Sequence, residues 1–101
     1  MPAGYSQIDR VPGTNQIVDF EGGLSHELRL ELLSLIQYML GWNVSIDFSQ
    51  KQTVGTLKEA IMKAGTVDED DLAVLCLHQN WPLLKEALGA ELALPHREKT
   101  R

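Results

Sequence analysis

Residues 24–42, LSHELRLELLSLIQYMLGW, constrain the fold more than any other segment, because they predict a helix with an unusually wide apolar surface. At about 100° per residue, most of its apolar side chains fall on one broad face. That face comprises Leu24, Leu28, Leu32, Leu33, Leu35, Ile36, Met39 and Leu40, with Leu30 further round. The apolar arc covers roughly half the circumference, against about 100° or more for an ordinary surface helix. This width indicates a partner surface, most simply on a second copy of the chain.

Both ends of this helix carry recognisable signals. Ser25 is placed to cap the N-terminus, and Glu27 in the first turn suits the positive end of the helix dipole. Gly41 supplies the C-terminal stop. The remaining polar arc is narrow and consists of Glu27, Glu31, Ser34 and Tyr38. The segment therefore predicts one helix with a narrow solvated face.

Two short segments have the composition of β-strands. Residues 42–49, WNVSIDFS, alternate apolar and polar side chains, which is the period of a strand with one buried face. Residues 15–20, NQIVDF, precede a Gly22-Gly23 break. Because a single strand needs a neighbour, residues 42–48 are expected to pair with residues 15–20 or with the same strand of another subunit. An extended linker, held in place by its apolar side chains, is the alternative for residues 42–48.

A second helix is expected from about residue 50 to 64, ending at Gly65. Its start is marked by two alternative capping boxes, Ser49 with Gln52 and Thr56 with Glu59. Its predicted buried stripe is Val54, Leu57, Ile61 and Ala64. The helix is therefore expected to lie against the core along one side.

Two further helices complete the expected set. One starts at Thr66 and runs to about Gln79, with four consecutive acids in its first turn. The other begins at Asn80-Trp81-Pro82, where a proline in the first turn costs little, and it ends before Pro95. Its buried stripe is Leu84, Leu88 and Leu92. Trp81 is expected either in the core or in contact with a partner.

These elements predict a mostly helical α+β fold, with about four helices and one or two short strands in a single small domain. The length of 101 residues suffices for one domain only. Residues 1–14, with two prolines and two glycines, are expected to form a flexible N-terminal arm. The helical domain is assigned to residues 15–94, and residues 95–101 form a polar C-terminal tail.

The charge of the chain argues against nucleic acid and anionic membranes as partners. The formal net charge is −5, and residues 1–50 alone carry six acidic and two basic side chains. Binding to phosphates normally requires a basic face, which this chain lacks outside residues 96–101. The apolar stretch of residues 28–40 is interrupted by charged and polar residues, so it predicts no membrane span. No leader sequence is evident, and we expect a cytoplasmic protein.

No combination of residues predicts catalysis, a metal or a cofactor. The single cysteine, Cys76, lies in the apolar context LAVLCLH and is expected to be a small buried residue. His78 is two residues away, and such residues diverge on a helix, so the pair does not predict a nucleophile with its base. The acids of residues 68–71 are consecutive, unlike the spaced ligands of a calcium loop. We therefore expect a protein without enzymatic activity.

A helix-turn-helix is the one nucleic-acid motif that the sequence allows. Residues 66–79 and 81–92 are two helices joined by a tight turn, and the second would be the recognition helix. Lys85 is its only basic residue, and no Arg, Asn or Gln is available within it to contact base edges. The acidic first turn of the preceding helix would repel the phosphate backbone.

The sequence therefore favours a non-enzymatic protein-binding regulator, such as a small inhibitor, anti-activator or adaptor that occupies the surface of a partner. A transcription regulator is the suggested target, because an acidic chain suits a basic partner. A homodimer is also expected. The predicted interface residues are Leu28, Leu30, Leu32, Leu33, Ile36, Met39, Leu40 and Trp42. The alternatives are an acidic dimeric secretion or folding chaperone, a helix-turn-helix DNA-binding protein, and coverage of the wide helix by the chain itself.

Overall fold

The structure is a computed structural model that describes residues 6–90. A hairpin of strands β1 (Ser6–Arg10) and β2 (Ile17–Glu21) is followed by helices α1 (His26–Gly41), α2 (Val54–Ala64) and α3 (Glu69–Gln79). Residues 82–90 form a fourth helical segment directly after α3. The predicted mostly helical α+β fold, with four helices and a two-stranded antiparallel sheet, is confirmed.

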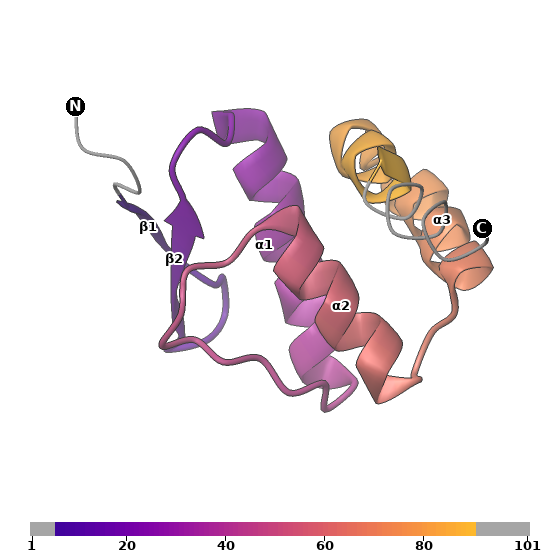
Figure 1. The fold of residues 1–101 in the computed structure, drawn as a ribbon, viewed down its shortest axis with the longest axis horizontal. Helices are drawn as coiled ribbons and strands as arrows, with labels where there is room; N and C mark the ends of the chain where they lie inside the picture. The colour runs from indigo at the N-terminus through magenta and orange to yellow at the C-terminus, as the bar shows by residue number, and fades with distance from the viewer. Residues whose placement is uncertain (1–5, 91–101) are drawn as a thin grey trace, which may run out of the picture.

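The elements are arranged along the longest axis of the molecule (Figure 1). The hairpin lies at one end, and α3 with the segment of residues 82–90 lies at the other. Helices α1 and α2 lie between these ends and contact each other. Helix α1 is therefore enclosed by elements of its own chain on several sides.

The core explains how the wide apolar arc of α1 is accommodated. Five residues of α1 are buried in the single chain, namely Leu32, Leu33, Leu35, Ile36 and Met39. They share one cluster with Val11, Val18 and Phe20 from the hairpin, Val54, Leu57 and Ile61 from α2, and Leu72, Cys76, Trp81, Leu84 and Leu88 from the C-terminal part. The alternative in which the chain itself covers this helix thus accounts for most of the arc.

The hairpin corrects the prediction of a flexible arm over residues 1–14. Residues 6–10 form β1, and Val11 is completely buried. The side chain of Gln7 exchanges two hydrogen bonds of 3.2 Å with the backbone of Leu24, and Asp9 forms a 2.7 Å ion pair with Arg29. Because polar side chains make these contacts, β1 lacks the apolar alternation that marks a strand in sequence. The other residues of the predicted arm, 1–5, lie outside the described part.

The strand predicted for residues 42–48 is wrong, since no residue of this segment belongs to a strand, but its apolar side chains do hold it against the core, as the alternative proposed. Residues 42–43 and 48–49 form turns, and residues 44–47 between them have no regular structure. The side chain of Val44 is buried, while Ile46 and Phe48 pack against the core. Strand β2 pairs instead with β1, and its other edge makes one parallel bridge, between Phe20 and Gln52.

Helix ends show which local signals the fold uses. Ser25 caps α1 as predicted, since its hydroxyl accepts from the Leu28 N–H at 3.1 Å. Neither predicted capping box starts α2, which is capped by Thr53 and its reciprocal partner Thr56. Gly65 ends α2 as predicted, in the left-handed conformation with φ of 72°. Gln52 bridges to β2 and Thr53 is extended, with φ of −130° and ψ of 175°, so α2 begins at Val54, directly after these two residues.

The later elements differ from expectation at their boundaries. Helix α3 begins at Glu69 and is capped by Asp68, not by Thr66. In α2, the predicted stripe is confirmed at Val54, Leu57 and Ile61, whereas Ala64 is exposed. Leu92 and the predicted tail of residues 95–101 lie outside the described residues.

Glu31 has a structural role that its position on the polar arc did not indicate. Its Oε1 accepts a 2.7 Å hydrogen bond from the backbone N–H of Leu84, in the first turn of the fourth helical segment. The residue before this segment is Trp81, whose side chain cannot supply the oxygen of an ordinary cap. A carboxylate of α1 therefore caps a helix that is distant in sequence and fixes the two elements together.

We expect Glu31→Ala to lower the free energy of unfolding by about 1–2 kcal/mol, because it removes this charge-assisted cap. Urea denaturation followed by circular dichroism would measure the loss. Glu27→Ala is the matched control, since Glu27 is exposed in the first turn of the same helix and is expected to cost no more than about 0.5 kcal/mol. Equal effects of the two substitutions would contradict the capping role.

Candidate protein-binding surface

The predicted interface on α1 is largely internal to the chain. Leu32, Leu33, Ile36 and Met39 are buried in the core. Leu28, Leu40 and Trp42 are partly buried and pack against the core cluster, and Leu30 alone among the predicted set is more than half exposed, at 51%. A partner could reach the four core side chains only if the domain opened, so a contact surface must be sought elsewhere.

The most exposed large hydrophobic side chain of the described residues is on α3. Leu77 is 67% exposed and Val74 is 51% exposed. On a helix these positions lie away from Leu72 and Cys76, the two buried residues of α3. Helix α3 is therefore apolar on its solvent side as well as on its core side, and this outer surface has no covering element within residues 6–90.

Leu77 borders a groove between α3 and the segment of residues 82–90. The groove consists of two adjoining hollows of about 360 Å³ and 110 Å³, which share Cys76 and Lys85. The α3 wall is formed by Glu69, Leu72, Ala73, Cys76 and Leu77, and the opposite wall by Trp81, Pro82, Lys85, Glu86, Leu88 and Gly89. The groove therefore has a mainly apolar floor with charged residues on its rim.

Small side chains and a tight turn create this groove. Ala73 and Cys76 on α3 and Gly89 on the opposite wall leave room between the two helices. Asn80 adopts the left-handed conformation with φ of 61°, and the Trp81 N–H donates to the Cys76 carbonyl at 2.9 Å. The chain thus reverses within two residues, which sets the two helices side by side.

Trp81 closes the end of the groove and is mainly a core residue. Only 6% of it is exposed, and its ring meets Tyr38 edge-to-face at a centroid distance of 5.7 Å. Tyr38 also stacks at 5.7 Å against Trp42 in a tilted arrangement. Tyr38, which the sequence placed on a solvated arc, therefore joins α1 to the base of the groove.

The electrostatics of the groove combine a neutral floor with an acidic end. Burial raises the pKa of the Cys76 thiol, with a further increase from the Glu31 charge that Lys85 partly opposes. The thiol is therefore neutral at physiological pH and acts as a small apolar group, as predicted for a buried cysteine. Glu69 lines one end of the groove, beside the exposed Asp70 in the same first turn of α3.

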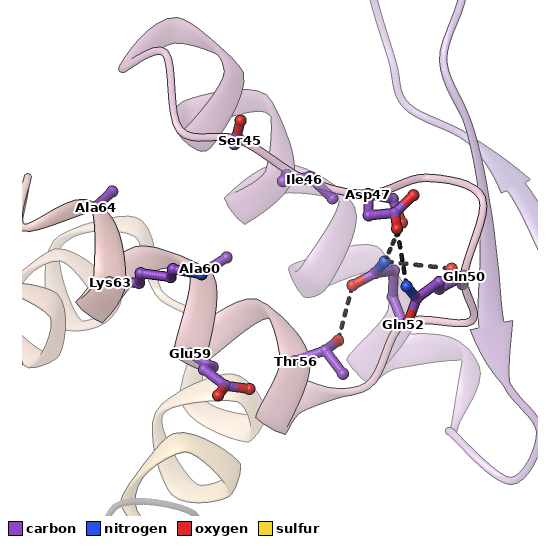
Figure 2. Close-up of a pocket in the computed structure, with 10 residues that line it drawn as sticks. All are labelled: Ser45, Ile46, Asp47, Gln50, Gln52, Thr56, Glu59, Ala60, Lys63 and Ala64. Atoms are coloured by element: carbon purple, nitrogen blue, oxygen red, sulfur yellow. Dashed lines mark hydrogen bonds between the residues drawn. The ribbon is translucent and has the colours of Figure 1, made fainter.

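A second, polar hollow of about 500 Å³ lies between α2 and the loop before it (Figure 2). Figure 2 shows the Gln52 side chain at one end of the hollow, where it donates to the carbonyls of Asp47 and Gln50 and accepts from the Thr56 hydroxyl. Hydrogen bonds from the side chain and the backbone of Ser49 hold the pKa of Asp47 below its usual range. These bonds stabilise the turn, and the ionised, hydrogen-bonded Asp47 is unsuited to transferring protons near neutral pH.

The described residues bring together no metal-binding group or nucleophile with its base. Among residues 6–90, no three His, Cys, Asp or Glu side chains are placed to hold a metal ion. Cys76 is buried and His78 is exposed, on different sides of α3. None of the helices within these residues combines the length and apolar character that a membrane crossing requires. The absence of catalytic activity stays a prediction.

The exposed apolar surface on α3 was not predicted from the sequence, although a signal was present. Val74 and Leu77 fall outside the stripe of Leu72 and Cys76, so α3 is apolar on more than one side. Comparisons with protein-family models, curated proteins and solved structures gave no match to this chain.

Proposed function

We propose that this protein is a non-enzymatic protein-binding regulator that receives an apolar helix of its partner in the groove beside α3. The observation that carries the proposal is the exposed Leu77 on the rim of a hollow floored by Cys76 and Trp81. A groove between two helices accepts the apolar stripe of a third helix, as in other helix-in-groove complexes. Apolar side chains that protrude beside a preformed hollow are typical of contact sites.

The charges around the groove favour a partner helix with basic residues beside its apolar stripe. Glu69 and Glu86 line the groove, and the exposed Asp70 and Asp71 extend the acidic end. Lys85 is the only basic residue of the lining. Charge complementarity of this kind selects partners and speeds association. A basic DNA-binding transcription regulator has the matching chemistry, so inhibition or anti-activation of such a protein is the form of regulation we propose.

The two alternative functions, a chaperone and a DNA-binding protein, would each require a different kind of ligand to bind at this surface. A secretion or folding chaperone would bind extended segments of a client, whereas a groove between two helices suits a helix. A helix-turn-helix protein would insert residues 82–90 into the major groove of DNA. The acidic first turn of α3 lies next to that segment, which disfavours an approach to phosphates.

The proposal is tested with an amphipathic helical peptide of leucine and lysine as the probe, added to the isotope-labelled protein in an NMR titration. We expect shifts confined to residues that line the groove, and at least about tenfold weaker binding by Leu77→Glu. Leu30→Glu is the matched control, because Leu30 is similarly exposed on α1, and it should bind like the wild type.

Further probes separate the alternatives. A peptide with the same composition, scrambled so that no apolar face forms, should bind weakly, and a leucine–glutamate version should not bind. Equal binding of the scrambled peptide would favour the chaperone. Salt-dependent binding to duplex DNA that is lost in Lys85→Ala would favour the DNA-binding protein. Proteins retained from a host lysate by the wild type and Leu30→Glu, but not by Leu77→Glu, would then be candidates for the partner.

A further inference from the structure

The orientation of the β1 backbone follows from the contacts on the other side of the hairpin. The Glu21 N–H donates to the Gln52 carbonyl at 2.9 Å, and the Gln52 N–H donates to the Asp19 carbonyl at 2.8 Å. Residues 19 and 21 therefore direct their backbone groups away from β1. Because these directions alternate along a strand, Val18 and Phe20 direct theirs toward β1.

The register of the hairpin then identifies which part of β1 is unpaired. Val18 is opposite Asp9, and Phe20 is opposite Gln7, so Gln7 and Asp9 use their backbone groups within the hairpin. Ile8 and Arg10 direct theirs outward, as does the backbone of Ser6. Within the described residues, β1 has β2 as its only neighbour in the sheet. The outer edge of β1 is thus available for pairing.

We propose that a second copy of the chain pairs with this edge, β1 against β1, antiparallel, with Ile8 on the two-fold axis. In this register Ile8 is opposite Ile8 of the other copy, and Ser6 is opposite Arg10. All three outward-facing residues then exchange backbone hydrogen bonds with their counterparts. The two hairpins become one four-stranded sheet, which is more stable than an isolated pair of strands.

The side chains on the outer face of the hairpin support a second copy as the occupant. Ile8 is 64% exposed, and on the axis it would contact its own counterpart as a cross-strand pair. Arg10 of one copy would be opposite residue 6 of the other copy, and residue 6 is opposite Glu21 in the same hairpin. The three positions form one row across the sheet, which brings the opposite charges of Arg10 and Glu21 within reach of each other. The two-fold axis repeats this attraction, so the edge is complementary to itself in shape and in charge.

The outer edge of β1 also lacks most of the residues that prevent edge strands from pairing with another chain. Neither proline nor lysine occurs within β1. Asp9 faces inward, which protects many edges, but here its charge is paired with Arg29 at 2.7 Å. The hairpin lies at the opposite end of the molecule from α3 (Figure 1), so pairing would leave both grooves open. The dimer would thus present two grooves to its partners.

A charge-reversal cycle tests this pairing. Within one chain, Arg10 and Glu21 lie at opposite ends of the hairpin, about 13 Å apart along the strands, so they barely interact. Between copies they would lie two strands apart in one row, about 10 Å between Cα atoms, so that the long Arg10 side chain could reach Glu21. We expect the wild type to form dimers with increasing concentration in light scattering, and Arg10→Glu and Glu21→Arg each to weaken dimerisation about tenfold or more. The double variant Arg10→Glu/Glu21→Arg should restore it.

Two further variants test the backbone pairing of β1 and its independence from the groove. Ile8→Pro removes an outward N–H without removing a hydrogen bond of the hairpin, so it should give a monomer that unfolds at a urea concentration close to that of the wild type. Leu77→Glu, at the other end of the molecule, should leave the dimer intact, which separates this proposal from the proposed function. A wild type that is monomeric at all concentrations overturns the proposal. So does a dimer that the single reversals do not weaken or the double variant does not restore.

Discussion

Leu33→Glu is expected to unfold the protein at room temperature. Leu33 is only 6% exposed and belongs to the core formed by α1, so a glutamate there would bury a charge without a partner. Such a substitution costs more than about 4 kcal/mol, which is most of the stability of a small domain. Circular dichroism at 25 °C and urea denaturation would show a loss of helical signal or a greatly lowered midpoint.

Leu30→Glu is the matched control for this prediction. Leu30 is on the same helix but is 51% exposed, so the same change is expected to alter the free energy of unfolding by no more than about 0.5 kcal/mol. The comparison separates two views of α1. If its apolar arc were a dimer seam, Leu33→Glu would give a folded monomer. That outcome would contradict the enclosure of α1 by its own chain.

Trp81→Ala is expected to lower the free energy of unfolding by about 3–5 kcal/mol, because it removes a large aromatic side chain from the core. The edge-to-face contact with Tyr38, at 5.7 Å between ring centroids, would be lost as well. The cavity would form where the fourth helical segment joins α1. Urea denaturation would measure the change, with Trp42 as the remaining fluorescent tryptophan.

Leu83→Ala tests whether the effect of Trp81→Ala is specific to the buried ring. Leu83 is two residues further along and is exposed, so its truncation is expected to cost less than about 1 kcal/mol. Trp81→Phe should recover much of the loss, since it keeps an aromatic ring in the same place. A loss in Trp81→Ala no larger than in Leu83→Ala would mean that Trp81 is a surface residue.

The helices could be predicted because their signals are local. Ser25 caps α1, and Gly65 ends α2, through conformational preferences that belong to those residues. The buried stripe of Val54, Leu57 and Ile61 follows from helical spacing alone. Both predicted capping boxes of α2 were wrong, because Thr53 caps the helix, directly after the residue that bridges to Phe20.

The strands were harder to predict because their patterns depend on what covers them. Residues 42–48 have the alternation of a strand, yet within residues 6–90 they pair with no strand and form two turns joined by an irregular segment that packs against the core. Strand β1 has the opposite character, since its inward side chains are polar and are satisfied by Leu24 and Arg29. In both cases partners that are distant in sequence outweigh the local alternation.

For the candidate surface, too, some features follow from the sequence and others only from the tertiary structure. The sequence by itself determined the helices, the apolar character of α1 and the burial of Cys76, because these depend on side-chain type and on spacing along one chain segment. Only the tertiary structure decided that α1 is enclosed, that Glu31 caps a distant helix, and that Leu77 remains exposed beside a groove. The physical reason is that exposure is a property of the assembled elements. An apolar side chain is buried or available according to what packs over it.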